Sequence, residues 1–118
     1  MAHWTVCTHG GTQLTSRELF EWTHEAQERG AGEILFTSMN HDGTRHGYPC
    51  TTFARLASHL RIPIIASGGA GCADDIAHVL AEGRADAALA ASIFHYGEIT
   101  IPQLKEELLR QGIQVRKY

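Results

Sequence analysis

Long apolar runs, clustered basic residues and paired cysteines are all missing from this sequence of 118 residues. No apolar stretch approaches the roughly 20 residues that a helix needs to cross a bilayer, and the first four residues lack the charged and apolar regions of a signal peptide. The formal net charge is −3 with both signs interspersed, whereas binding to a nucleic-acid backbone needs a clustered basic face. We therefore expect a cytoplasmic protein with neither a membrane nor a nucleic-acid partner.

Recurrent spacings of metal ligands and disulfides are missing as well. The three cysteines are scattered without a C-x-x-C pair, which fits a reducing compartment better than a disulfide framework. Eight histidines are present, and His41 and His46 flank Asp42. Neither H-E-x-x-H nor another metal-ligand spacing occurs, however. We expect no metal and no cofactor.

Composition and patterning instead indicate one globular domain. With 43% hydrophobic and 19% charged residues, a chain of this length has material for one modest core. From residue 15 onward, short apolar runs alternate with amphipathic stretches, which is typical of βα units that build a parallel sheet. We predict a single α/β domain over 1–118, with a strand-like or hairpin-like lead-in at 1–14 and then, at 15–118, a helix and three βα units.

Four helices are expected. The first spans Thr15–Arg29, because Thr15 and Glu18 have the spacing of a capping box and Gly30 follows as a stop. Two more helices are expected at 51–60 and 73–82, and the last begins at Thr100. The residues of the first helix that we expect to face inward are Leu19, Trp22 and Ala26.

Three parallel strands are expected at 33–38, 63–67 and 86–92. The first of these is a nearly continuous apolar run, which is typical of a strand covered on both faces. Residues 4–9 alternate weakly and predict either an edge strand or a hairpin. Such a sheet leaves its outer edges unpaired unless something covers them. We therefore expect that the chain forms a homo-oligomer or was once longer.

Each predicted strand ends in a loop with small residues and hydroxyl groups. These loops are Asp42-Gly43-Thr44, Ser67-Gly68-Gly69 and Ala91-Ser92. In βα-repeat proteins the loops after the strands form the active face. Glycine lets the backbone approach a ligand closely, and a helix N-terminus favours an anion. The pattern predicts a phosphate site formed by these three loops; the alternative is that each loop is an ordinary turn.

Two carboxylates need an explanation. Asp42 lies in a loop of the predicted active face, where it could accept a proton, orient a substrate hydroxyl or cap the turn. Glu33 lies at the opposite, N-terminal end of its strand. A charge there needs a partner if it is buried, and otherwise it is a solvated strand start. Asp42 is the candidate catalytic residue.

Several segments resemble the cyclase subunit of imidazole glycerol phosphate synthase. The segments that resemble its final strands and loops are residues 30–35, 40–44, 65–71 and 87–95. Residues 4–11 resemble the segment after that family's fifth barrel strand, and residues 112–116 resemble its terminus. A sugar-phosphate isomerase of the same pathway shares some of these loops, but the forms Ser-Gly-Gly-Ala-Gly and Ala-Ala-Ser-Ile-Phe-His favour the cyclase.

The resemblance implies a fold and an activity. The family is a (β/α)₈ barrel that takes ammonia from a glutaminase partner, closes an imidazole ring and releases imidazole glycerol phosphate and a ribotide. This chain would be a partial barrel with roughly the last three βα units. The resemblance assigns Asp42 to an acidic active-site position and Glu33 to the neighbourhood of the ammonia entrance. It assigns one phosphate of the ribotide substrate to Gly43, Ser67, Gly69, Ala91 and Ser92.

The departures from the family also matter. A complete barrel needs about 250 residues, and the family's catalytic aspartates follow its first and fifth strands, neither of which is present. Pro49 stands where the family usually has an aspartate, and His41 where it often has a basic residue. We expect a cyclase fragment that is inactive unless its N-terminal half complements it. The alternatives are an inactive module that binds a ribotide or free phosphate and a structural oligomer without a ligand.

Overall fold

The computed structural model describes residues 4–9, 13–39 and 47–116. Its centre is a parallel sheet of β3 (Ile34–Thr37), β4 (Ile64–Ser67) and β5 (Ala87–Leu89), in that order. This confirms the three predicted parallel strands. β5 is shorter than the predicted strand 86–92, because the chain leaves the sheet after Leu89 and a short helix, α4 (Ser92–His95), follows.

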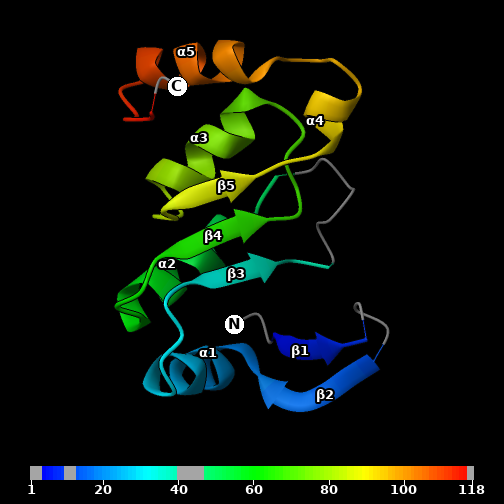
Figure 1. Cartoon of the computed structure of the whole chain (residues 1–118), viewed down its shortest axis with the longest axis vertical. Helices are drawn as coiled ribbons and strands as arrows, with labels where there is room; N and C mark the ends of the chain where they lie inside the picture. Colours follow the sequence, from blue (N-terminus) through cyan, green and yellow to red (C-terminus); the bar gives the residue numbers. More distant parts are fainter. Residues whose placement is uncertain (1–3, 10–12, 40–46, 117–118) are drawn as a thin grey trace.

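The larger helices lie on one side of this sheet. They are α1 (Leu19–Glu28), α2 (Cys50–His59), α3 (Ala73–Ala81) and α5 (Ile101–Arg110). Figure 1 shows α2 and α3 behind the strands, with α1 and α5 toward the two ends of the row. In the part of the chain that the structure describes, no helix is both long and apolar enough to cross a membrane.

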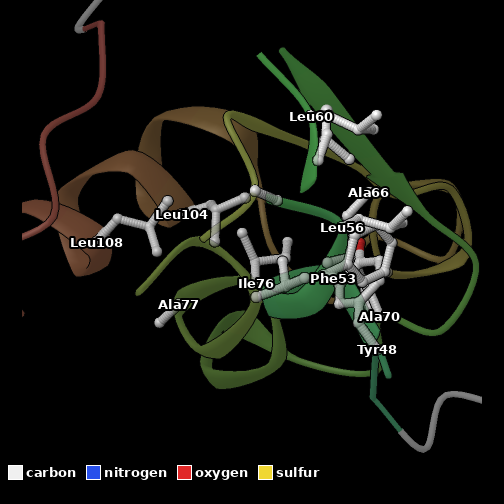
Figure 2. Packing of buried hydrophobic residues seen from close by; sticks show 14 of the residues in the cluster. Tyr48, Phe53, Leu56, Leu60, Ala66, Ala70, Ile76, Ala77, Leu104 and Leu108 are labelled. Atoms are coloured by element: carbon white, nitrogen blue, oxygen red, sulfur yellow. The ribbon is translucent and has the colours of Figure 1, made fainter. Parts of the chain in front are cut away.

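The core lies between the sheet and these helices. Its largest fully buried side chains are those of Phe53, Leu56, Ile64, Ile93 and Val79. Figure 2 shows the cluster running from Tyr48 and Phe53 past Ile76 to Leu104 and Leu108 of α5. Leu19 of α1 belongs to the same cluster, which thus joins elements from α1 to α5.

The N-terminal segment forms a hairpin. β1 (Thr5–Thr8) pairs antiparallel with β2 (Gln13–Glu18), with Cys7 opposite Leu14. The hairpin segment packs against the parallel sheet through Trp4. The Trp4 ring lies edge-on to that of Phe36 in β3, with ring centroids 5.5 Å apart. Of the two possibilities left open for residues 4–9, the structure has the hairpin.

The predicted start of the first helix is wrong. Residues 15–18 belong to β2, and α1 begins only at Leu19. The Thr15 hydroxyl donates across the hairpin to the Val6 carbonyl at 2.6 Å, so it does not cap a helix. Glu18 is itself the N-cap, and its carboxylate accepts from the Phe20 N–H at 2.7 Å.

The predicted inward face of this helix is also wrong in part. Leu19 is buried as expected, but its buried companions are Thr23 and Gln27. Trp22 is 38% exposed, and the Arg17 guanidinium lies 4.8 Å from the centre of its ring. The buried face instead carries polar residues that find hydrogen-bond partners: the Thr23 hydroxyl donates to the Leu19 carbonyl, and the Gln27 side chain accepts from the Arg61 N–H after α2.

The sheet is covered on one face only, which corrects the expectation for residues 33–38. Strand register places six residues on the uncovered face, hereafter the open face: Leu35, Thr37, Ile65, Ser67, Ala87 and Leu89. Leu35 is 58% exposed and Leu89 is 52% exposed. Ser67, at the end of β4, is buried, but no helix or strand of the described residues lies over the rest of this face, which Figure 1 shows from the front.

Candidate functional site

The candidate site lies at the edge of the sheet where the strands end. Register pairs Ser67, the last residue of β4, with Leu89, the last residue of β5. The Ser38 N–H after β3 donates to the Ser67 carbonyl at 3.2 Å. The chain therefore leaves all three strands at one edge, as the arrowheads in Figure 1 show.

Two of the three predicted loops begin at this edge. The Ser67–Gly69 loop follows β4 and the Ala91–Ser92 segment follows β5, its neighbour in the sheet. The third predicted loop, with Asp42 and Gly43, lies outside the residues that the structure describes.

Three backbone N–H groups at this edge have no hydrogen-bond partner among the described residues. Within the described residues, the N–H groups of Gly69, Ala70 and Ser92 donate to no other group. Ser92 is half-buried, and Gly69 and Ala70 are buried. Buried N–H groups normally have a partner, and converging backbone N–H groups suit an anion.

Glycine is required in the β4 loop for reasons of backbone geometry. Gly68 and Gly69 have φ of +85° and +138°, which L side chains rarely adopt. A Cβ on Gly69 would also stand 2.3 Å from the carbonyl oxygen of Gly47. The segment before α2 touches the β4 loop at this point, and the Gly47 N–H donates to the Gly69 carbonyl at 2.7 Å. The sequence signalled these glycines, but their contact with Gly47 could not be read from it.

Sequence reasoning missed Tyr48 entirely. Its side chain is buried, and its hydroxyl donates to the Leu89 carbonyl at 2.8 Å. The partners are 41 residues apart in the sequence, so no local pattern could reveal the bond.

Asp75 was missed too. It lies in the first turn of α3, and its Oδ2 accepts from the Gly71 N–H at 2.8 Å. Its Oδ1 lies close to Gly47, 3.2 Å from where a Cβ of that residue would be. Asp75 therefore holds the segment that follows the β4 loop through the Gly71 N–H. That N–H is then not free to bind an anion.

Two titratable groups near these loops are held in their neutral forms. Burial raises the pKa of the Tyr48 phenol well above its ordinary value, and the Asp75 carboxylate adds to the effect. Burial also raises the pKa of the Cys50 thiol, with smaller contributions from Glu82 and Asp75. Both groups stay protonated at neutral pH, so neither serves as a general base.

The remaining predicted residues lie elsewhere. Glu33 is exposed just before β3, at the opposite end of the sheet from the loops. A solvated strand start accounts for this position. In the ranges 4–9, 13–39 and 47–116, no group of three His, Cys, Asp or Glu side chains could hold a metal ion, and His41, Asp42 and His46 fall outside those ranges.

Known proteins are similar in sequence to this chain over most of its length. A relative from Phocaeicola vulgatus named "Imidazole glycerol phosphate synthase subunit HisF" is 56% identical over 113 residues. Proteins of the same name from Bacteroides fragilis (strain YCH46) and Anoxybacillus flavithermus are 58% identical over 113 and 48% identical over 116 residues. These matches cover 96%, 96% and 98% of this chain, respectively.

The same matches cover only 45%, 45% and 46% of the three relatives. The chain thus spans a little under half the length of the curated relatives it matches. Its motifs resembled the cyclase subunit, and the relatives confirm that resemblance. A family model described as "Histidine biosynthesis protein" matches residues 2–100. The chain therefore belongs to the histidine biosynthesis protein family.

Proposed function

We propose that this chain is the C-terminal, phosphate-binding part of a cyclase of the HisF kind, and that its three βα units are part of a (β/α)₈ barrel. The edge where β3, β4 and β5 end would hold one phosphate of a phosphorylated ribotide. The observation that carries the proposal is the pair of adjacent loops after β4 and β5, with unpartnered N–H groups at Gly69, Ala70 and Ser92.

A phosphate suits this edge for three reasons. The β4 loop carries no side chain at Gly68 or Gly69 that could obstruct a ligand. The β4 loop leads into the N-terminus of α3, where the helix dipole favours negative charge. The carboxylates of Asp74 and Asp75 in the first turn of α3 oppose an anion, and we therefore expect free phosphate to bind weakly and the ribotide to bind through additional groups.

Catalysis would require a second part. Asp42 remains the proposed acidic residue of this chain, and ring closure needs two positioned acid–base groups. Tyr48 and Cys50 do not supply the second, because burial raises the pKa of both side chains and neither gives up its proton readily at neutral pH. We propose that the chain alone has no cyclase activity and that a polypeptide carrying the earlier barrel strands restores it.

The end of the sheet opposite the loops also has a proposed role, in the entry of ammonia. The relatives are named as a subunit of a synthase, and in the full-length family the partner would be a glutaminase that supplies ammonia. Glu33 is exposed at the end of the sheet away from the loops. We propose that this end faces the ammonia entrance, with Glu33 at its rim.

Phosphate binding tests the site directly. Calorimetric titration of the purified chain with inorganic phosphate should show saturable binding. Ser92→Asp should weaken that binding about tenfold or more, because a like charge beside the anion is unfavourable. Ser58→Asp is the matched control, since Ser58 is an exposed serine of α2 and should leave the dissociation constant unchanged. Equal loss in both variants, or no binding by the unaltered chain, would contradict the proposed site.

Complementation tests the enzyme. The unmatched N-terminal part of the Bacteroides fragilis relative, expressed separately and mixed with this chain, should form product when ammonia is supplied. Neither part alone should do so. Turnover by the isolated chain would overturn the expectation that it lacks an acid–base pair. Phosphate binding without complementation would favour a binding module instead.

A further inference from the structure

Tyr48 links two of the loops that carry the proposed phosphate site. It lies in the last segment of the chain before α2, and its hydroxyl donates to the carbonyl of Leu89, the final residue of β5, at 2.8 Å. Its immediate neighbour Gly47 donates its N–H to the Gly69 carbonyl in the β4 loop at 2.7 Å. Two consecutive residues thus hold the ends of two neighbouring strands.

The geometry makes the Tyr48 side chain a rigid support. The residue is 7% exposed, and its ring lies edge-on to Phe53, with centroids 6.5 Å apart. Figure 2 shows Tyr48 within the cluster that includes Phe53 and Ala70. A buried hydroxyl without a partner is costly, so the packed ring keeps the hydroxyl aimed at the Leu89 carbonyl.

The end of β5 needs such a support. β5 has three residues and pairs only with β4 among the described strands. The Leu89 side chain is 52% exposed, and the following segment has the irregular Ala91 backbone and a helix of four residues. Short edge strands with exposed backbone open readily, and Ser92 lies only three residues beyond Leu89.

We propose that Tyr48 is a positioning residue for the phosphate site, whose hydroxyl holds the segment Leu89–Ser92 against the β4 loop so that both loops contact the same phosphate. This inference rests on the proposed phosphate site. Tyr48 does not touch the phosphate itself. Its effect is on the geometry of the Ser92 N–H relative to those of Gly69 and Ala70.

Tyr48→Phe tests the inference, because it removes the hydroxyl and keeps the packed ring. At a temperature where both proteins are folded by near-ultraviolet circular dichroism, calorimetry should show inorganic phosphate binding about fivefold more weakly, the equivalent of one typical hydrogen bond. Amide hydrogen exchange of residues 91–93 should become faster than in the unaltered chain. Tyr96→Phe is the matched control, since Tyr96 is 69% exposed, and it should change neither measurement.

The outcomes separate this inference from the proposed function. If the unaltered chain and Tyr48→Phe bind phosphate equally, Tyr48 is merely structural and the inference is overturned while the phosphate site stands. If the unaltered chain binds no phosphate, both fail. If Tyr48→Phe does not fold, exchange in the unaltered chain decides: saturating phosphate should slow the amides of residues 69–70 and 91–93 together, and slowing at 69–70 alone overturns the inference.

Discussion

At the scale of single residues, glycine is needed at position 69 for two separate reasons, and the sequence indicated only one of them. The sequence suggested glycine there because a ligand needs close access to the backbone. The structure adds a constraint within the protein, since a Cβ would stand 2.3 Å from the Gly47 carbonyl oxygen and φ is +138°. A substitution at Gly69 therefore disturbs the fold before it disturbs a ligand, which is why Ser92 is the better position for testing phosphate binding.

Gly69→Ala should destabilise the chain substantially. The left-handed backbone and the clash with Gly47 together should cost about 2 kcal/mol or more. Urea unfolding followed by circular dichroism measures this cost. Gly30→Ala is the control, because φ is +104° there but a Cβ would meet nothing within 4 Å, so only the backbone cost of about 1 kcal/mol should appear. Equal losses in both variants would show that the contact with Gly47 is unimportant.

At the scale of elements, α5 is the helix that local sequence describes best. Thr100 was expected to begin it, and the structure confirms a capping box: the Thr100 hydroxyl accepts from the Gln103 N–H at 3.2 Å, and the Gln103 side chain accepts from the Thr100 N–H at 2.9 Å. Leu104 and Leu108 then face α3 and are buried. Cap and apolar periodicity agree, so the helix could be predicted.

Thr100→Ala should destabilise the chain by about 1 kcal/mol, because the bond from the Gln103 N–H to the Thr100 hydroxyl is lost. Thermal unfolding should register a lower midpoint. Thr51→Ala in the first turn of α2 is the control, since Thr51 is exposed and forms no hydrogen bond of its side chain with another described residue. An unchanged midpoint in Thr100→Ala would mean that α5 is held by packing alone.

The hairpin is the element that local sequence misrepresents. Thr15 and Glu18 have the spacing of a capping box, yet Thr15 pairs across the hairpin with Val6. A capping pattern involves four residues, whereas the hairpin adds an antiparallel ladder, with Thr5 opposite Glu18 and Thr8 opposite Gln13. The ladder gives the backbone groups of β2 partners on β1, and a four-residue capping pattern carries no information about that strand.

At the scale of the whole molecule, the open face determines whether the protein associates with other chains. Leu35 and Leu89 are exposed on it by 58% and 52%, beside the half-buried Ile65. Exposed apolar surface of this kind favours association. We therefore retain the proposal that the isolated chain forms a homo-oligomer. In the proposed complete barrel, other strands would cover this face instead.

Charges on the open face should dissociate that oligomer. Sedimentation velocity at micromolar concentration should give an assembly for the unaltered chain and a folded monomer for the double variant Leu35→Glu, Leu89→Glu, because burying two carboxylates in an interface is unfavourable. Leu109→Glu on α5, where the leucine is 39% exposed, should leave the assembly intact. A folded monomer of the unaltered chain would show that the open face tolerates water.

The sequence by itself determined the features that depend on near neighbours: the three strands, the helices after them, the cap of α5 and the glycines of the β4 loop. Periodicity and turn chemistry act within a few residues, so a linear reading finds them. Only the tertiary structure decided the hairpin, the bond from Tyr48 to Leu89, the approach of Asp75 to Gly47 and the open face. Each depends on residues far apart in the chain meeting in space, or on what covers a surface, and neither is encoded in local spacing.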